Sequence, residues 1–166
     1  PNDILLNGKK VCGILTELSV SPEGAVRWVI PGIGVNVNLH AVDFPAPLRD
    51  IATSLSIERG LDCSRLELGR AICYQMETLY RDFISCGGDA QVFLPRYKVY
   101  SATLLRRIRL FLGQEQLEGT AEDFDSDGAF LLRPDDGTLR RIFTGEVPSH
   151  TPQQYSDDFA AGGDDE

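Results

Sequence analysis

Residues with the chemistry to bind anions gather near the start of the chain. Asn2 and Asp3 precede Lys10, and Asn36 follows Gly34. A lysine ammonium suits a carboxylate or phosphate as a point charge, and an aspartate beside phosphate suits Mg2+. An asparagine on a polar strand face can bind a nucleotide base or ribose. These types suggest a nucleotide-like ligand, although on composition alone an ordinary structural role is favoured, because the same types are common at strand ends and turns.

Short strands must position these residues. Residues 9–20 predict a strand, and residues 25–30 predict its hairpin partner. Valine alternates with asparagine over 35–38, which is typical of a strand with one polar face. Gly32 and Gly34 leave the start of that strand nearly bare of side chains, so a ligand could lie flat on the backbone.

Helices are predicted after these strands. A short helix is expected over 47–57, and helical spacing of apolar residues over 64–88 predicts a long one with Ser64 as its cap. A further short helix is expected near 90–101.

The chain changes character after residue 103. Short apolar segments alternate with glycine- and aspartate-rich turns, which predicts a small barrel of four or five strands. The segment "DFDSDG" (123–128) matches half of a calcium loop, but Pro134 stands where such a loop needs a glutamate, so we interpret it as a hairpin turn. A second hairpin turn is expected at 134–137, and disorder after Thr151.

Composition limits the class of protein. The net charge of −9 argues against a general nucleic-acid binder, although Arg106, Arg107 and Arg109 could meet an anionic partner. No apolar run reaches the length of a membrane span. The four cysteines lack metal-site spacing, and Cys12 and Cys73 are expected to be buried thiols. We therefore expect a cytoplasmic protein without a structural metal.

Taken in order, these pieces resemble the biotin protein ligase family. "PNDILLNGKKVCGILTE" (1–17) is similar to the family's "WPND…K..GIL.E" segment, and "GIGVNVN" (32–38) to its "G.GIN" strand. The similarity continues through "DFP…ATSL" and the C-terminal segments, over about residues 1–150. The resemblance implies an α+β fold with three parts: a mixed-sheet, class II synthetase-like catalytic portion over 1–102, an SH3-like β barrel over 103–150, and a disordered acidic tail over 151–166.

The family resemblance also implies a reaction. Biotin's carboxylate attacks the α-phosphate of ATP, with Mg2+, and forms biotinyl-5'-AMP and pyrophosphate. A lysine of a biotin carboxyl carrier protein domain then takes the biotinyl group as an amide. No contact of this part of the chain with nucleic acid or membrane is expected, and a homodimer is left open.

Site residues follow from the same resemblance. Lys10 matches the lysine that contacts the biotin carboxylate and the α-phosphate, and Lys9 is its solvated neighbour. The implied biotin-binding residues are Lys10, Gly13, Ile14, Leu15, Gly32, Ile33 and Gly34. The implied ATP-binding residues are Asn2, Asp3, Asn36 and Glu146, with Asp3 also a Mg2+ ligand.

One departure from the family pattern concerns completeness. The glycine- and arginine-rich loop that folds over biotin and adenylate in the family is expected before residue 1, so we expect an incomplete site and little ligase activity from this chain alone. Two alternatives remain open: a lipoate-type ligase or acyltransferase, and a non-catalytic interaction fragment.

Overall fold

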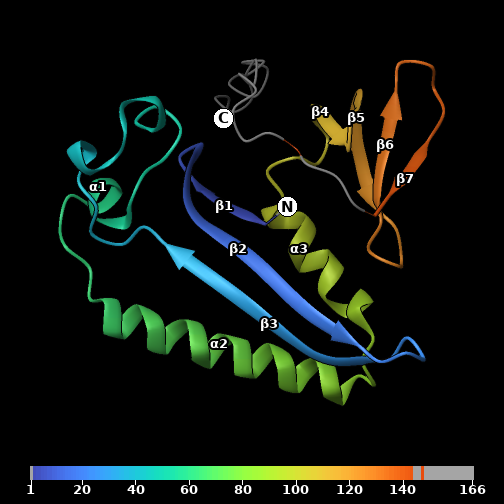
Figure 1. Ribbon diagram of the computed structural model, residues 1–166, viewed down its shortest axis with the longest axis horizontal. Helices are drawn as coiled ribbons and strands as arrows, with labels where there is room; N and C mark the ends of the chain where they lie inside the picture. Colours follow the sequence, from blue (N-terminus) through green and yellow to red (C-terminus); the bar gives the residue numbers. More distant parts are fainter. Residues whose placement is uncertain (1, 144–146, 148–166) are drawn as a thin grey trace, which may run out of the picture.

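The first part of the chain forms a three-stranded antiparallel sheet (Figure 1). The computed structural model describes residues 2–143 and 147. The sheet contains, in spatial order, β1 (Asp3–Leu6), β2 (Lys9–Val20) and β3 (Val26–Val35). Asn7 and Gly8 join β1 to β2 with φ angles of 50° and 77°, the left-handed backbone that a tight two-residue hairpin turn requires.

Strand β3 is longer than the sequence predicts. Separate strands were expected over 25–30 and 31–38, but one strand runs through Pro31 and ends at Val35. A proline is tolerated there because β3 is an edge strand, paired only with β2. The Asn36 amide bonds to a later loop, so the predicted strand is confirmed over 31–35 and wrong over 36–38.

The connection after β3 holds less helix than the helix predicted over 47–57. It contains two 3-10 turns and one short helix, namely Ala41–Asp43, Ala46–Leu48 and α1 (Leu55–Arg59). The Ser54 hydroxyl accepts a hydrogen bond of 3.1 Å from the Ile57 backbone N–H and caps α1. Gly60, with φ of 72°, ends the helix.

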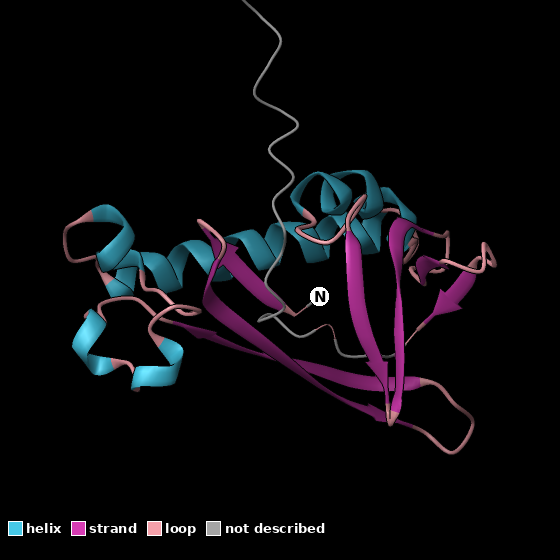
Figure 2. Ribbon diagram, turned by 90° about the horizontal axis from the view of Figure 1, so that it is seen from above, coloured by secondary structure: helices cyan, strands magenta, loops and turns pink. Residues whose placement is uncertain are grey.

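The long helix α2 (Arg65–Ser85) confirms the helix predicted over 64–88. Its cap is Ser64, whose hydroxyl accepts a hydrogen bond from the Glu67 backbone N–H. Figures 1 and 2 show α2 running alongside β3 and diverging from the far end of the β2–β3 hairpin. None of its residues is buried, so Cys73, expected to be a buried thiol, is exposed.

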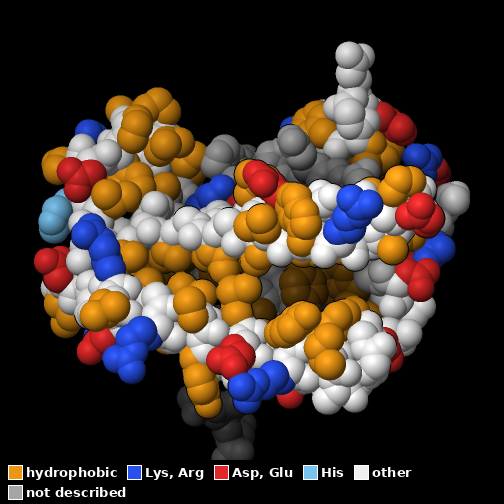
Figure 3. All heavy atoms as spheres, turned by 60° about the horizontal axis from the view of Figure 1, so that its bottom comes forward, with side chains coloured by type: hydrophobic (Ala, Val, Ile, Leu, Met, Phe, Trp, Pro, Cys, Tyr) orange, Lys and Arg blue, Asp and Glu red, His pale blue; other side chains and the backbone are white. Residues whose placement is uncertain are grey.

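Apolar side chains remain exposed on both the hairpin and α2 (Figure 3). On the hairpin they are Leu15, Leu18, Val20, Val26, Trp28, Val29 and Ile30, and on α2 they are Leu66, Tyr74, Met76, Leu79, Tyr80 and Ile84. Apolar surface of this extent is typical of a contact surface. In the part of the chain that the structure describes, no helix is long and apolar enough to cross a membrane.

A second antiparallel sheet follows a short helical segment. The 3-10 turn Ala90–Phe93 and α3 (Leu94–Tyr100) confirm the helix predicted near 90–101. The sheet contains, in spatial order, β4 (Arg107–Leu112), β5 (Glu115–Phe124), β6 (Phe130–Pro134) and β7 (Arg140–Ile142). Among the described residues no pairing joins β7 to β4, so the closed SH3-like barrel stays a prediction.

The second sheet has its own apolar core. Its buried members are Ile108, Leu110, Leu117, Ala121, Leu132 and Ile142. Helix α3 packs on this sheet through Tyr97, whose ring meets Phe124 edge-on at 5.1 Å, and through a Lys98–Asp123 ion pair of 2.6 Å. Burial raises the pKa of the Tyr97 hydroxyl.

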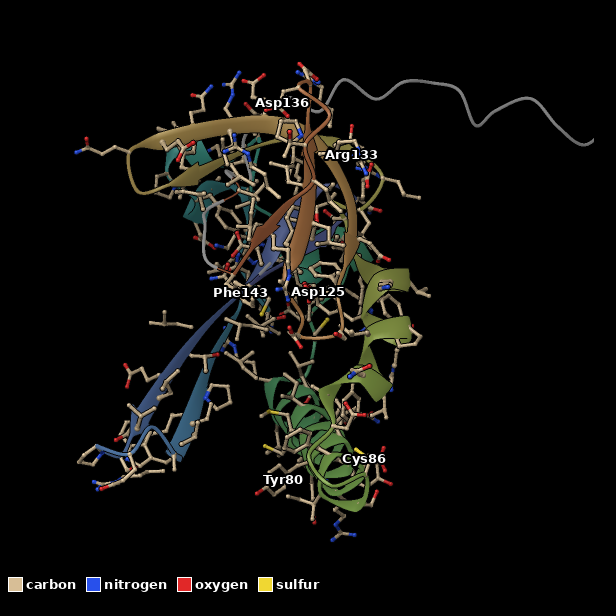
Figure 4. All side chains as sticks on the ribbon, turned by 90° about the vertical axis from the view of Figure 1, so that its right-hand side faces the viewer. Tyr80, Cys86, Asp125, Arg133, Asp136 and Phe143 are labelled. Atoms are coloured by element: carbon tan, nitrogen blue, oxygen red, sulfur yellow. The ribbon has the colours of Figure 1, made fainter. Side chains whose placement is uncertain are left out.

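Both turns predicted in this sheet are present. In the first, the Asp125 carboxylate accepts hydrogen bonds of 2.9 Å from the backbone N–H groups of Asp127 and Ala129. Arg141 on β7 donates to both aspartates and stacks on Phe143, and its hydrogen bond lowers the pKa of Asp125. In the second, the Gly137 N–H donates to the Pro134 carbonyl at 3.0 Å. Asp125 and Phe143 lie at one end of the sheet, and Asp136 and Arg133 at the other (Figure 4).

Two arginines of the predicted basic patch lie on β4 and have carboxylate partners. Arg107 pairs with Asp135 at 2.6 Å, and Arg109 pairs with Glu118 at 2.7 Å. These acids offset the positive charge that an anionic partner would need.

Gly119→Ala should destabilise the second sheet. A Cβ at Gly119 would lie 2.5 Å from the Arg133 carbonyl oxygen and 2.8 Å from the Pro134 nitrogen. Because these are backbone atoms, strands β5 and β6 must move apart, and we expect a loss of about 1–3 kcal/mol in the free energy of unfolding. Urea unfolding would measure it.

The matched control is Gly69→Ala on α2, where an added Cβ meets nothing within 4 Å. This change should leave stability unchanged or raise it by about 0.5–1 kcal/mol. Equal stability of the two variants would contradict the close packing at Gly119.

Candidate functional site

The site is centred on an ion pair between β1 and β2. The Lys10 ammonium nitrogen lies 2.6 Å from an Asp3 carboxylate oxygen, and the two side chains are 38% and 26% exposed. An ion pair this open to solvent can exchange partners with an incoming anion or cation. The lysine and aspartate named from the sequence are therefore brought together by the fold.

An irregularity in β2 makes this pairing possible. Lys10 and Gly13 are three positions apart, and in a regular strand such residues face opposite sides of the sheet. The register changes from Ile4 opposite Cys12 to Leu5 opposite Lys10, so β2 carries one extra residue, Val11. This bulge turns Lys10 onto the face of Asp3.

Gly13 makes room for the pair. It lies directly opposite Asp3 in the ladder, and a Cβ there would approach the Lys10 side chain to 3.3 Å at Cε and 3.4 Å at Nζ. Any larger side chain at this position would compete with Lys10 for the same space.

Glycines continue this face across the hairpin. Gly34 lies opposite Gly13, and Gly32 lies opposite Leu15. Residues directly opposite across strands share a face, so these three glycines and Leu15 form a row beside Lys10. The glycine row exposes backbone where a flat ligand could approach closely.

Two residues predicted for the biotin site face the other way. Ile14 lies opposite Ile33, and each is one position away from the glycine row, so their side chains point to the opposite face of the sheet. Only their backbone borders the site. The alternation of side chains along a strand indicates that Ile14 and Ile33 lie on the other face, whereas a match to a linear motif does not show which face a residue occupies.

The two predicted asparagines hold the chain in place. The Asn2 amide donates to the Ile14 carbonyl at 3.0 Å, and the Ile14 N–H donates back to the Asn2 carbonyl at 2.8 Å. The Asn36 amide donates to the Thr53 carbonyl at 3.0 Å. Glu146, the fourth predicted ATP-binding residue, lies outside the described residues, as does the predicted disordered tail.

Lys9 and Lys10 differ in their partners. Lys9 donates to the Arg49 carbonyl at 3.2 Å, whereas Lys10 meets a carboxylate on the glycine-lined face. Nearby, burial raises the pKa of the Cys12 thiol, the Asp3 carboxylate raises it further, and Lys10 opposes this shift. This thiol is therefore a protonated, buried side chain.

Metal binding at this site would rest on few ligands. The described part of the chain contains no group of three or more His, Cys, Asp or Glu side chains that could hold a metal ion. A single carboxylate such as Asp3 suits Mg2+ only together with substrate phosphates, a common arrangement for this ion.

Sequence reasoning missed two residues behind Lys10. Thr53, 1% exposed, donates its backbone N–H to the Lys10 carbonyl and its hydroxyl to Glu58. Thr53 lies in the "ATSL" segment, but no local pattern connects this segment to a lysine some forty positions earlier. The one available signal in the sequence was a threonine directly before a serine that could cap a helix.

Comparisons with known proteins show which proteins the chain is similar to. Residues 106–147 match the family model described as the biotin protein ligase C terminal domain. The bifunctional ligase/repressor BirA of Bacillus spizizenii is 37% identical over 147 residues, which cover 89% of this chain and 44% of that protein. The chain thus spans less than half the length of this curated relative.

Solved structures extend the similarity to the fold. The apo biotin protein ligase of Aquifex aeolicus superposes with a TM-score of 0.73 at 25% identity, over 89% of this chain and 62% of that one. The same ligase in complex with biotin and ATP gives a TM-score of 0.70 at 26% identity, over 89% of this chain and 58% of that one.

Gly13→Ala should displace the Lys10 ammonium from Asp3 without unfolding the sheet. The added Cβ would meet the flexible end of Lys10 rather than backbone, so we expect stability to change by less than about 1 kcal/mol. NMR of the Lys10 side-chain nitrogen would report the displaced ammonium.

Gly34→Ala is the control, because its Cβ would meet only the Gly13 carbonyl at an ordinary 3.8 Å. A Lys10 signal that stays in place in Gly13→Ala, or moves equally in both variants, would contradict the role assigned to Gly13.

Proposed function

We propose that this chain, which contains the C-terminal region of a biotin protein ligase, forms one wall of a site where biotin reacts with ATP. In this reaction the biotin carboxylate attacks the α-phosphate, and pyrophosphate leaves. The biotinyl group of the resulting biotinyl-5'-AMP then passes to a lysine of a carboxyl-carrier domain, and AMP leaves. The Lys10–Asp3 pair beside the glycine row is the observation that carries the proposal.

Lys10 supplies the electrostatic part of this chemistry. Two anions, a carboxylate and a phosphate, must approach within bonding distance, and negative charge builds on the α-phosphate oxygens. A fixed ammonium lowers the cost of both, more strongly where water is excluded. Lys10 supports this role because its ammonium stands on an open face with one partner that a ligand can replace.

The glycine row supplies the surface on which the ligand lies. Gly13, Gly32 and Gly34 leave the backbone open, so a ring or an extended chain can approach without meeting side chains. Leu15 lies on the same face and is exposed, so it is available for an apolar contact with the biotin chain. Ile14 and Ile33 would contribute backbone only.

Asp3 has two parts to play in this scheme. It holds the Lys10 ammonium before ligands arrive, and it is the carboxylate that would help to hold Mg2+ beside the ATP phosphates, where the ion would neutralise phosphate charge. Asn2 and Asn36 would act indirectly, by fixing the strands that carry the site.

The wall formed by this chain needs an opposing wall. Apolar side chains on the hairpin and on α2 remain exposed, Leu15 among them on the face of Lys10, and the mixed anhydride of the adenylate must be shielded from water. The exposed surfaces can keep water from the anhydride only if a second polypeptide segment covers them. We therefore propose low activity from this chain alone.

The setting follows from the same proposal. The acceptor would be the lysine of a biotin carboxyl carrier protein domain, and the reaction would occur in the cytoplasm. Among the described residues, the outer edge of β3 pairs with no other strand, which is compatible with a homodimer. No contact with nucleic acid is proposed for this acidic part of the chain.

Lys10→Ala tests the site. We define the extended form as this chain joined to the N-terminal part of a biotin ligase catalytic domain. In the extended form, loss of the ammonium should slow adenylate formation by about a hundredfold to a thousandfold, the usual effect of removing one charge-stabilising group. Pyrophosphate release from ATP and biotin measures the rate. Lys9→Ala is the matched control and should retain full activity; unchanged adenylate formation in Lys10→Ala would rule out the assignment.

Completeness of the site can be tested with labelled biotin and ATP. The extended form should make biotinyl-5'-AMP, and this chain alone should make little or none, because half of the surface that excludes water is absent. Replacing biotin by lipoate should abolish product in both forms. Robust product from this chain alone would refute the one-wall proposal, and preference for lipoate would point to a lipoate-type ligase.

A further inference from the structure

The backbone of Lys10 is fastened by a segment far away in sequence. The Lys10 N–H donates to the Ile51 carbonyl at 2.9 Å, and its carbonyl accepts from the Thr53 N–H at 2.9 Å. The two bonds form an isolated parallel bridge around Ala52. Both backbone polar groups of the key residue are thus tied outside the three-stranded sheet.

This attachment matters because Lys10 lies at the bulge. A one-residue change of register in a strand moves side chains to the opposite face. If the bulge moved from Val11 to another position in β2, the side chain of Lys10 would turn to the other face of the sheet. The Lys10 ammonium would then leave the face that carries Asp3 and the glycine row. Something outside the β1–β2 ladder must therefore hold the bulge in place.

Thr53 is the central residue of the hydrogen bonds that fasten Lys10 and the bulge. It is 1% exposed, and its three polar groups are all used. Its N–H binds Lys10, its carbonyl accepts from the Asn36 amide at 3.0 Å, and its hydroxyl donates to Glu58 at 2.6 Å. The backbone of Thr53 thus binds Lys10 and Asn36, and its hydroxyl links this backbone to Glu58, so the residue can transmit position between them.

Glu58 closes the network back to the turn before Lys10. Its second oxygen accepts from the Asn7 amide at 2.5 Å, and Asn7 is the first residue of the β1–β2 turn. The hydrogen bond from Thr53, then that from Asn7, and the nearby charge of Lys9 lower the pKa of the Glu58 carboxyl. The carboxylate form that accepts both bonds is thereby favoured.

We infer that Thr53 and Glu58 are positioning residues that fix the bulge in β2 and so hold the Lys10 ammonium on the face of Asp3 and Gly13. The ring runs from Lys10 through Thr53, Glu58 and Asn7 and returns to Lys10 through the two intervening residues, Gly8 and Lys9. The inference about geometry stands on the hydrogen bonds alone, and its consequence for catalysis rests on the proposed function.

Two threonine variants separate the hydroxyl from the shape of the side chain. Thr53→Val keeps the shape and loses the donor, whereas Thr53→Ser keeps the donor and loses a methyl group. The readout in this chain is the NMR contact between the Lys10 Cε protons and the Gly13 Cα protons, since Lys10 Cε packs against Gly13. We expect this contact to be lost in Thr53→Val and retained in Thr53→Ser.

The control is Thr78→Val on α2, which removes a threonine hydroxyl that donates to the Tyr74 carbonyl far from the site. It should leave the Lys10–Gly13 contact unchanged. Retention of the contact in a folded Thr53→Val, or its loss in Thr53→Ser, would overturn the inference. If Thr53→Val does not fold, Glu58→Ala poses the same question, with Glu77→Ala on the exposed face of α2 as its control.

Kinetics in the extended form test the catalytic consequence. A misplaced Lys10 should lower kcat for adenylate formation by about tenfold to a hundredfold in Thr53→Val, with less change in KM for biotin, and Thr53→Ser should restore the rate. Loss of the NMR contact with an unchanged kcat would overturn the catalytic consequence. If even the unsubstituted extended form were inactive, the proposed function would fail, while the NMR result would still decide whether Thr53 sets the bulge.

Discussion

One extra residue in β2 is the constraint on which the site depends. Val11 displaces the register so that Lys10, Asp3 and Gly13 meet on one face, although the spacing of Lys10 and Gly13 would separate them in a regular strand. A bulge costs ladder hydrogen bonds, so it must be stabilised from outside. The bridge to residues 51–53 and the Asn36 amide supply that support. The position of one ammonium thus depends on segments from three parts of the chain.

The chain divides its apolar residues between a closed core and an open surface. The second sheet buries its own core and is joined to α3 by Tyr97 and Lys98. The hairpin and α2 instead leave their apolar faces in contact with solvent. Burial of such surface is the main favourable term in folding and association, so these faces favour a covering layer. On the hairpin, Leu15 and Ile30 share the face of Lys10, and Leu18 and Val29 lie on the opposite face.

In both sheets, charged side chains form ion pairs with partners in the same sheet or its turns. Arg141 bridges the two aspartates of the first turn in the second sheet, and Arg107 is held by an aspartate of the second turn. These pairs are exposed, so each contributes little stability, but they specify the turns. At the site, by contrast, the Lys10–Asp3 pair stands over bare backbone, where a ligand could replace either partner.

Local signals in the sequence determined the elements that depend on neighbouring residues. Capping by Ser64 fixed the start of α2, and aspartate- and glycine-rich turns marked the hairpins of the second sheet, because these signals act within a few positions. The linear motif also singled out Lys10 rather than Lys9. Only the tertiary structure decided which face each residue occupies. It joined the strands predicted over 25–30 and 31–38 into one strand that ends at Val35. It also separated Ile14 and Ile33 from the face of Lys10 and linked Thr53 and Glu58 to Lys10 and Asn7. The reason is physical: register and bulges are set by hydrogen bonds between distant segments, and no local pattern of residues records them.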